Sequence, residues 1–446
     1  MPLEIYRLIT EMNFFRHIVS VVVCFVLSTI CGTSLAQNLN SSNLSSSPYN
    51  RYGYGRMGSL GNTVTRSMGD VGIAVRSNQF TTVANPASLT AIDTLTMIFT
   101  VGLDAQFGSY SEDGNHNRKW DAGFNGMSFQ APLWNNFAMS LSLSPYSMVG
   151  YYYGSSDKTP VQNPTQPHDT LSYASTHSGI GGINNFMFGL GWRPLRTKKQ
   201  ELSVGANVGW LFGQVQHSST LSTSSQANNT FVMYDASVRA LYLQFGAQYT
   251  YRIDASNSLT IGAIYAPELN MTVNASSIKF STDTIMAFDK IRDGIRQPMR
   301  YGVGLTYNLY RKLTITGEYE MAKWGDVTGL NTQMTPQDGV FNDSYRVAFG
   351  AEYLPKTATN NFFKACRYRV GANYKTSYLK VNGKELRELN ATLGMSMPVN
   401  KRSSIDLGVG YQTLLPEGGS MVKENYLTLS LGITFNEMMF FRNMLR

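Results

Sequence analysis

The feature that most constrains the fold of this chain is a two-residue period in its polarity. Between residues 425 and 435, Leu and Ile alternate with Thr, Ser and Gly, and successive side chains of a β-strand point to opposite faces. About fourteen segments between residues 94 and 435 repeat this pattern, most of them over roughly ten residues, the length of a tilted membrane-spanning strand. Their expected starts are Thr94, Trp120, Asn136, Leu171, Glu201, Phe231, Ser258, Met299, Leu313, Ser344, Arg367, Glu388, Ser404 and Asn425. The period predicts an all-β fold, a transmembrane antiparallel β-barrel of about fourteen strands.

A soluble β-sandwich also alternates, so the connections between the strands decide between the two. Short turns are expected at residues 132–135, 193–200, 253–257, 310–312 and 400–403, and they alternate with longer polar loops at 155–170, 216–230, 282–298 and 325–343. Residues 355–365 are an exception, because they are longer than the other short-side turns. Short turns inside and long loops outside are typical of outer-membrane barrels. Tryptophans at or beside strand ends indicate an interfacial aromatic girdle; these are Trp120, Trp134, Trp192 and Trp324.

The first 36 residues are predicted to be a signal peptide. Residues 18–30 are an apolar stretch, and the small residues Ser34 and Ala36 suit a cleavage site before Gln37. Either Met1 or Met12 could be the true start. After cleavage Cys366 is the only cysteine, so no internal disulfide is expected. No other apolar run is long enough for a spanning helix, and we expect export to the outer membrane of a Gram-negative cell.

Composition narrows the classes of partner. The chain has a net charge of +8 and 15% charged residues, and its Lys and Arg residues are scattered through turns and loops rather than clustered. Nucleic-acid binding is therefore not expected. Attraction to the anionic headgroups of outer-membrane lipid or lipopolysaccharide is the use that this charge favours.

Residues 69–93 fit neither a polar tail nor a strand. Gly69 and Gly72 allow a tight backbone path, and Asn85-Pro86-Ala87 is a helix start, with Asn85 as N-cap and Pro86 at the first helical position. The chain therefore divides into a polar lead at residues 37–68, this segment at 69–93, the barrel at 94–435 and a C-terminal tail at 436–446. Followed by a barrel, residues 69–93 are interpreted as a plug, or hatch, inside the lumen.

The Asn85-Pro86-Ala87 motif and the strand count together resemble the FadL-type (FadL/TodX-like) outer-membrane transporters of hydrophobic compounds. The aromatic lead SPYNRYGYG is similar to that of Bacteroidetes relatives. The resemblance implies passive transport of a hydrophobic or amphipathic, fatty-acid-like molecule, with release past the plug or sideways through the wall. A barrel of the PorV type, which resembles FadL but is a binding platform or shuttle for secreted proteins, is the alternative. A polar solute pore is less favoured because a plug would block it.

Two further sites are hypotheses. Ile285, Phe288, Ile291 and Ile295 are spaced to share one face of a helix, either as a loop that captures ligand or as a helix folded onto the barrel rim. Ser144-Pro145 interrupts the third strand. Because proline removes a ladder donor, it either opens the wall sideways, as the third-strand kink of FadL-type barrels implies, or it ends the strand. The length of residues 136–145 favours the second reading.

Catalysis is not expected. The histidines of the mature chain lie in or near expected loops without metal-like spacing, and His177-Ser178 are neighbours that a strand would point to opposite faces. Glu318 and Glu320 share one face, and pairing with Arg346 on the next strand or with the plug is the ordinary explanation for them. We therefore predict no enzyme, no cofactor and no metal site.

Overall fold

The structure is a computed structural model. It describes residues 46–112, 114–134, 136–160, 170–223, 229–281, 284–327, 340–355, 361–381, 383–400, 402–418 and 421–438, which belong to one compact unit spanning residues 43–446. The predicted signal peptide and residues 439–446 of the predicted tail lie outside the described residues.

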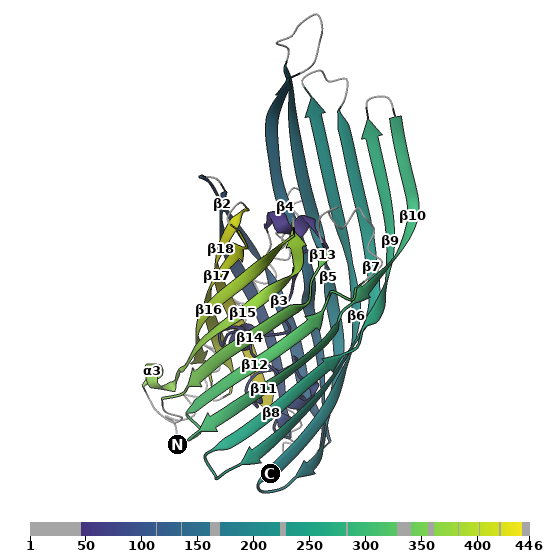
Figure 1. Ribbon diagram of the computed structural model, residues 1–446. Coiled ribbons are helices and arrows are strands. Elements are labelled where there is room, and N and C mark those ends of the chain that lie inside the picture. Colours follow the sequence, from purple (N-terminus) through teal and green to yellow (C-terminus); the bar gives the residue numbers. More distant parts are fainter. Residues whose placement is uncertain are drawn as a thin grey trace, which may run out of the picture. The chain divides into compact units, whose positions relative to one another are not determined.

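Long antiparallel strands form nearly all of the described unit (Figure 1). The strands are β2 (Thr96–Glu112), β3 (Asn115–Trp134), β4 (Phe137–Pro160), β5 (Thr170–Arg196), β6 (Gln200–Thr223), β7 (Thr230–Arg252), β8 (Ser258–Ala266), β9 (Leu269–Ser281), β10 (Thr284–Gln297), β11 (Met299–Leu309), β12 (Leu313–Lys323), β14 (Ser344–Tyr353), β15 (Arg367–Val381), β16 (Lys384–Pro398), β17 (Ser404–Pro416) and β18 (Lys423–Met438), with the two-residue strands β1 (Arg56–Met57) and β13 (Val340–Phe341).

The sheet closes on itself because β18 pairs with β2 from Met438↔Thr96 to Lys423↔Ser111. Strand β7 pairs with β8 and with β9, and β8 and β9 in turn pair with β11 and β10. Each of these two couples, β8 with β9 and β10 with β11, is therefore one wall strand broken near a proline, Pro267 or Pro298. Counted in this way, the described residues form a closed barrel of fourteen antiparallel strands. The predicted all-β barrel is confirmed.

The two faces of the wall have opposite chemistry. On β18 the outward side chains Leu427, Leu429 and Leu431 are exposed, whereas the inward Tyr426 and Thr434 are buried. The same alternation runs around the barrel and leaves a belt of exposed Leu, Ile, Val and Phe on the outside, as in membrane-spanning barrels. Among the described residues, no helix has the length and apolarity needed to cross a bilayer.

Six neighbouring strands, β4, β5, β6, β7, β9 and β10, continue beyond the apolar belt (Figure 1). We call this part the extension: residues 149–160, 170–181, 214–223, 230–238, 273–281 and 284–293. On its outer face the continuous apolar belt ends, and polar side chains such as Gln214, which donates to Asp235 at 2.8 Å, lie among exposed apolar ones such as Tyr152 and Phe280. Much of the predicted loops at 155–170, 216–230 and 282–298 is therefore strand. Both faces of a strand outside the membrane can be polar, so the two-residue period that marks spanning strands is lost there.

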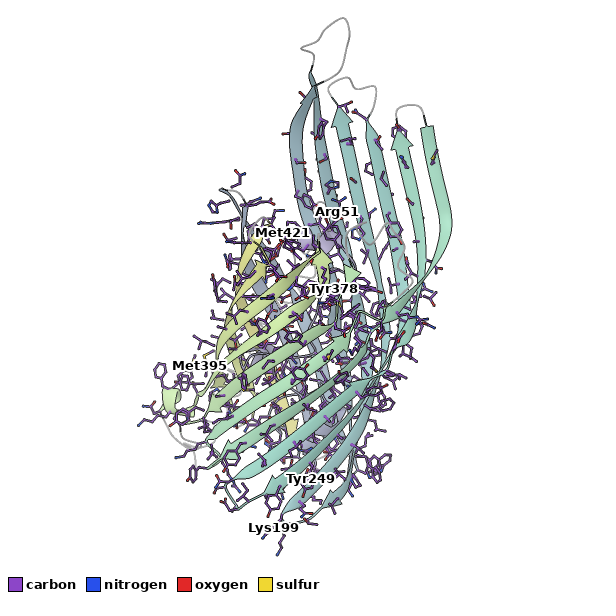
Figure 2. All side chains as sticks on the ribbon, viewed as in Figure 1. Arg51, Lys199, Tyr249, Tyr378, Met395 and Met421 are labelled. Carbon is purple, nitrogen blue, oxygen red and sulfur yellow. The ribbon has the colours of Figure 1, made fainter. Side chains whose placement is uncertain are left out.

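The helices are short. The N-terminal segment, residues 46–93, contains the 3-10 helix η1 (Pro48–Arg51), the α-helix α2 (Thr63–Arg66) and the 3-10 helix η2 (Pro86–Ala91). Helix α3 (Phe362–Ala365) lies between β14 and β15. Side chains at the two ends of the barrel are visible in Figure 2, with Arg51 and Tyr378 near the base of the extension and Lys199 at the opposite, short-turn end.

Candidate functional site

The N-terminal segment packs against the inner face of the wall. Helix η2 contacts β4, β5, β6 and β7, and helix α2 contacts β16, β17 and β18. Inward glycines of the strands make this approach possible. A Cβ added at Gly246 would lie 2.0 Å from Oδ1 of Asn85, and one added at Gly262 would lie 2.2 Å from the carbonyl oxygen of Ile73. A side chain at either position would displace the segment.

Asn85 joins the two halves of the segment. It is fully buried. Its Oδ1 accepts a hydrogen bond from the N–H of Ala87 at 3.0 Å, and its Nδ2 donates to the carbonyl oxygen of Ile73 at 2.7 Å. Pro86 follows at the first position of η2. The short capped helix predicted at Asn85-Pro86-Ala87 is present, and the same asparagine also holds the turn that precedes it.

Glu318 of β12 holds that turn from the wall. Its carboxylate accepts hydrogen bonds from three consecutive backbone N–H groups, those of Gly72 at 2.9 Å, Ile73 at 2.5 Å and Ala74 at 3.2 Å. Consecutive N–H groups that converge in this way form an anion-binding nest. On the same strand, Glu320 instead pairs with Arg346 at 2.8 Å and Arg300 at 3.3 Å. The sequence-based assignment of these two acids to Arg346 and to the segment is correct.

Gly69, near the middle of the segment, is anchored to β14, β15 and β16, which follow β12 around the wall. The N–H of Gly69 donates to Oγ1 of Thr392 at 2.9 Å, and its carbonyl oxygen accepts from Asn373 at 3.0 Å. Its φ is 76°, and an added Cβ would lie 2.6 Å from the carbonyl oxygen of Phe349. Only glycine fits this close approach without strain.

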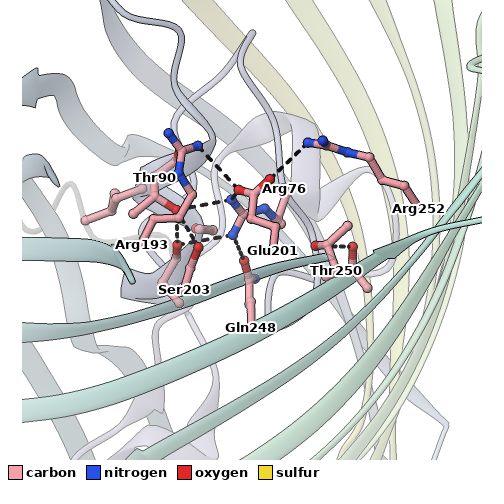
Figure 3. Close-up of polar contacts among 12 residues, drawn as sticks. Arg76, Thr90, Arg193, Glu201, Ser203, Gln248, Thr250 and Arg252 are labelled. Carbon is pink, nitrogen blue, oxygen red and sulfur yellow. Dashed lines mark hydrogen bonds and ion pairs between the residues drawn. The ribbon is translucent and has the colours of Figure 1, made fainter. Parts of the chain in front are cut away.

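A cluster of charges fixes η2 at the short-turn end (Figure 3). The Glu201 carboxylate accepts from Arg76 of the segment at 2.5 Å, from Arg252 at 3.0 Å and from Arg193 at 3.4 Å. Arg76 also donates to Gln248 at 3.0 Å, and Arg193 donates to the carbonyl oxygen of Thr90 at 3.0 Å. Three guanidinium groups thus share one carboxylate, which leaves an excess of positive charge beside the segment.

Two cavities lie on either side of residues 66–85. The first, of about 290 Å³, faces the extension and is lined by Arg66, Asp70 and Gly72 of the segment among other residues. We call it the upper chamber. The second, of about 780 Å³, opens at the short turns and is lined by Val75, Arg76 and Phe80 of the segment among others. We call it the lower vestibule. The segment separates the two.

The upper chamber has an apolar side and a polar side. The more apolar side comes from β4, β7, β8, β11, β12 and the residues beside them; it carries Tyr146, Tyr242, Ile264, Ala266, Pro267, Pro298, Ala322 and Trp324, together with Gln297 and the ion pair of Arg300 with Glu320. The polar side comes from β2 and β15–β18, and it consists of Asp104, Gln106, Lys375, Glu388, Asn390, Gln412, Thr428 and Ser430. The chamber therefore matches a molecule with one apolar and one polar end.

The wall beside the upper chamber is interrupted between β3 and β4. Pairing between these strands ends at Met127↔Leu143, and no ladder pair joins residues 115–126 of β3 to the described part of β4. The register of β4 on β5 shifts between Pro145 and Ser147. Strand β1 of the N-terminal segment pairs there instead, with Met57 opposite Ser147. We call this interval the wall gap.

The wall gap lies at the Ser144-Pro145 position singled out in the sequence. Strand β4 continues through Pro145 to Pro160, so the reading in which proline merely ends the strand is wrong. The hydroxyls of Ser142, Ser144 and Ser147 are buried and have no hydrogen-bond partner within the described part of the chain. A small cavity of about 30 Å³ reaches Ser142 and Ser144. Polar groups thus line the base of the gap, as an interrupted ladder within a membrane requires.

The predicted capture helix at Ile285, Phe288, Ile291 and Ile295 is wrong. These residues lie in β10, which pairs with β9 from Thr284↔Ser281 to Gln297↔Leu269 with a bulge after Phe288. Ile285 is exposed near the tip of the hairpin; the side chains of the other three lie outside the described residues. Four apolar residues with helical spacing can also lie in a strand. Here pairing with β9 satisfies the backbone N–H and C=O groups, so a helix is not needed to satisfy them.

Trp324 also departs from the sequence-based expectation. It is 4% exposed, whereas Trp120 and Trp134 face outward at 69% and 71%. Its ring packs 5.5 Å from that of Tyr54 and 4.5 Å from that of Tyr378. Trp324 therefore belongs to an inner aromatic cluster under the N-terminal segment and not to the interfacial girdle.

The inner face of the extension carries a polar cluster that the sequence did not predict. Tyr151 and Nδ1 of His217 are 2.7 Å apart, and Nδ1 of His177 is 2.8 Å from Oγ of Ser219. Arg51 of η1 donates to the hydroxyl of Tyr153 at 3.1 Å. Burial, with a smaller contribution from the positive charge of Arg51, lowers the pKa of His217 to about 4. The extension lies beyond the apolar belt, so this buried group is outside the membrane-spanning part of the barrel.

The His177–Ser219 pair does not form a catalytic triad. In the described part of the chain no acidic side chain bonds to His177, whereas a catalytic histidine is oriented by a carboxylate or its equivalent. The described residues also contain no group of three or more His, Cys, Asp or Glu side chains that could hold a metal ion.

Comparison with known proteins identifies a matching family and solved structures with a similar fold. The BamG family model matches residues 15–445, and a search of curated proteins found no match. Among solved structures, the chain is similar to the Pseudomonas putida toluene transporter TodX, with 16% identity, a TM-score of 0.53 and coverage of 86% of this chain and 100% of TodX. It is also similar to a Pseudomonas aeruginosa FadL homologue, with 12% identity, a TM-score of 0.56 and coverage of 85% and 99%.

A third similar structure is the Ralstonia pickettii toluene transporter TbuX, with 16% identity, a TM-score of 0.51 and coverage of 84% of this chain and 97% of TbuX. At these identities the likeness is one of fold. The fold of this chain is that of the FadL/TodX-type channels, as the sequence resemblance implied.

Proposed function

This chain belongs to the BamG family, and we propose that it is an outer-membrane channel through which amphipathic small molecules diffuse without chemical change. The observation that carries the proposal is an upper chamber of about 290 Å³ that reaches the wall gap, since Pro145, Tyr146 and Phe124 line both. A molecule in the chamber would have a sideways path into the membrane. The channels named among the similar solved structures give the same class of function, transport without catalysis.

In this proposal the N-terminal segment is a plug. The separation of the upper chamber from the lower vestibule supports this role, and so do the contacts of Asn85 with Ala263 of β8, of Glu318 with the turn and of Arg76 with Glu201, which hold the segment to the wall. Direct diffusion to the short-turn end would require the segment to move. Sideways exit through the wall gap would require only β1 of the segment to leave the edge of β4, and it is the path we favour.

The proposed substrate class is amphipathic and fatty-acid-like. The apolar side of the upper chamber would hold an alkyl or aryl portion. On the other side, Arg56 is held by the amide oxygens of Gln106 and Gln412, at 3.1 Å and 2.5 Å, and by the face of the Tyr426 ring. No ion pair forms to Arg56 among the described residues. Its charge is therefore placed to bind a carboxylate headgroup.

The surroundings proposed for the barrel are outer-membrane lipid and lipopolysaccharide. The exposed apolar belt would face acyl chains. The net charge of +8 favours anionic headgroups at the rims. We orient the barrel with the short turns toward the periplasm, as in other outer-membrane barrels. The extension then lies outside the cell.

A cross-link across the wall gap tests the proposal. In a Cys366→Ser background, Phe124→Cys and Tyr146→Cys would be bridged with a bifunctional maleimide, and uptake of a radiolabelled fatty acid would be measured with surface expression. Uptake should be lost on bridging. The matched control is Phe186→Cys with Trp210→Cys, which face outward from a paired part of the wall, and bridging there should leave uptake unchanged. Equal uptake before and after bridging of the gap pair would reject sideways passage.

A second candidate function, a PorV-like platform for secreted proteins, is favoured by the extension. Six strands project beyond the belt and expose both polar and apolar side chains, far more surface than a channel mouth needs. Replacing residues 218–233, the tip of the β6–β7 hairpin, by a short turn distinguishes the two functions. A platform would lose secreted proteins from the cell surface and keep fatty-acid uptake, whereas a channel alone would keep both.

A further inference from the structure

The lower vestibule is strongly cationic. Its lining includes seven basic residues, Arg76, Lys198, Lys199, Arg252, Arg311, Lys312 and Arg367, and two acidic residues, Asp254 and Glu352. The basic residues come from the N-terminal segment, from the turns after β5 and β11 and from the ends of β7 and β15, so they follow the rim of the opening from β5 to β15. Figure 2 shows Lys199 at this end of the barrel.

Both acidic side chains are already engaged. Asp254 accepts hydrogen bonds from the backbone N–H groups of Ser256 at 2.6 Å and Asn257 at 2.8 Å, which close its own turn. Glu352 is bound by Arg367 and by Arg369, each at 2.7 Å. Neither carboxylate is placed to neutralise Lys198, Lys199 or Lys312, and no ion pair forms to these three lysines in the described part of the chain.

The floor of the lower vestibule leaves this excess unchanged, because Arg193 offsets the charge of Glu201 there. Arg76 and Arg252 line the cavity, and together with Arg193 they share the single carboxylate of Glu201. A low-dielectric wall behind a cationic opening concentrates the field and raises the local concentration of anions. The geometry is that of a receptor for a ligand with several negative charges.

We propose that the lower vestibule docks an acidic peptide segment of a partner protein. The cavity of about 780 Å³ has room for several residues, and an extended peptide places a side chain every ~3.3–3.6 Å, so successive carboxylates can meet cations on separate turns. The basic residues face the mouth of the barrel and not its outer wall, which favours a ligand that enters the mouth over the headgroups of the surrounding bilayer. The periplasmic location of this partner rests on the proposed function; its binding does not.

Docking would also act on the segment. Arg76 is shared between the lower vestibule and the Glu201 cluster, so a bound carboxylate would compete with Glu201 for it. Competition for Arg76 would weaken one anchor of the N-terminal segment. Binding of an acidic partner at the mouth would therefore loosen the N-terminal segment, which separates the two cavities.

The test uses the purified full chain in a neutral detergent and a fluorescent peptide of alternating Glu and Gly, with a Gln/Gly peptide for comparison. Fluorescence anisotropy should show binding of the Glu peptide only, weakened as the ionic strength rises from about 0.05 M to about 0.5 M, where the screening length falls to a few ångströms. The variant Lys198→Glu/Lys199→Glu should bind the Glu peptide about tenfold or more weakly. The matched control Lys279→Glu/Lys423→Glu changes net charge equally among exposed lysines away from the short turns and should bind as the natural chain does.

Three outcomes would overturn the inference. The first is failure of the Glu peptide to bind, and the second is an equal loss of affinity in both double variants, which would indicate attraction to net charge alone. The third is displacement of the peptide by inorganic phosphate but not by chloride of equal ionic strength, which would make the vestibule a small-anion site. Fatty-acid uptake is measured separately, so loss of the proposed transport function and loss of peptide binding are distinguishable.

Discussion

Removing the carboxylate of Glu318 should release the N-terminal segment while the barrel stays folded. In Glu318→Ala the backbone N–H groups of Gly72, Ile73 and Ala74 lose their common acceptor at 2.5–3.2 Å. Each buried donor left without a partner costs about 1–3 kcal/mol. Three of them set an upper range of about 3–9 kcal/mol for the loss in docking of the segment, and relaxation of the turn brings the loss toward the lower end of that range. Asn85 and Arg76 still hold it, so the effect is partial opening.

The assay is the rate at which Val71→Cys, buried in the natural chain, reacts with a maleimide in a Cys366→Ser background. A loss of about 3 kcal/mol in local stability raises the open population, and with it the labelling rate, by about 100-fold. The control is Glu320→Gln, which lies on the same face of β12 and pairs with Arg346 and Arg300 but not with the turn at residues 72–74. An unchanged labelling rate in Glu318→Ala, or failure of the barrel to assemble, would refute the reasoning.

Three more predictions concern the segment and the extension. Gly246→Val should displace the segment and raise permeability to small polar antibiotics, because its Cβ would lie 2.0 Å from Asn85, whereas Gly410→Val, with its nearest atom at 3.6 Å, should not. Asn85→Ala removes the N-cap of η2 at about 0.5–2 kcal/mol, so the barrel should keep its resistance to detergent while the same permeability rises; loss of assembly would show that the segment is part of the barrel's framework. The pKa of His217 is lowered from 6.5 to about 4, so below pH 6.5 the unfolded extension binds a proton that the folded one does not. Its stability should fall by about 3 kcal/mol between pH 6.5 and pH 4, seen as lost amide protection in β5 and β6 and absent in His217→Gln.

Much of the barrel was readable from the sequence because lipid and lumen impose opposite demands on neighbouring residues. Leu429 and Leu431 meet the membrane while Ser430 between them meets the interior, so each spanning strand carries its own two-residue signature. The cap at Asn85-Pro86 was readable for a different reason, since capping chemistry depends only on adjacent residues. Inward glycines such as Gly246 and Gly262 held a further signal: two-residue alternation places them on the inner face, where a glycine marks a close approach of other backbone.

The extension and the site were decided by tertiary structure. Outside the membrane both faces of a strand can be polar, so β10 lost its period and its apolar residues resembled a helix. Trp324 sits at a strand end in the sequence, but only the path of the N-terminal segment turns that end into an inner aromatic cluster. The residues near a strand end do not determine whether an aromatic ring there packs inside the barrel or faces outward.

The strongest contacts of the site join residues that are far apart in the chain. The register of β5 on β6 brings His177 opposite Ser219, and the closed barrel brings Glu318 to the N–H groups of residues 72–74. The end of pairing between β3 and β4 at Leu143 depends on where the segment inserts β1. The sequence alone determined that the chain forms a closed sheet with a capped segment before it, because period and capping are local. The tertiary structure decided where the segment is held and where the wall is interrupted, because those depend on strand register and on contacts across the lumen.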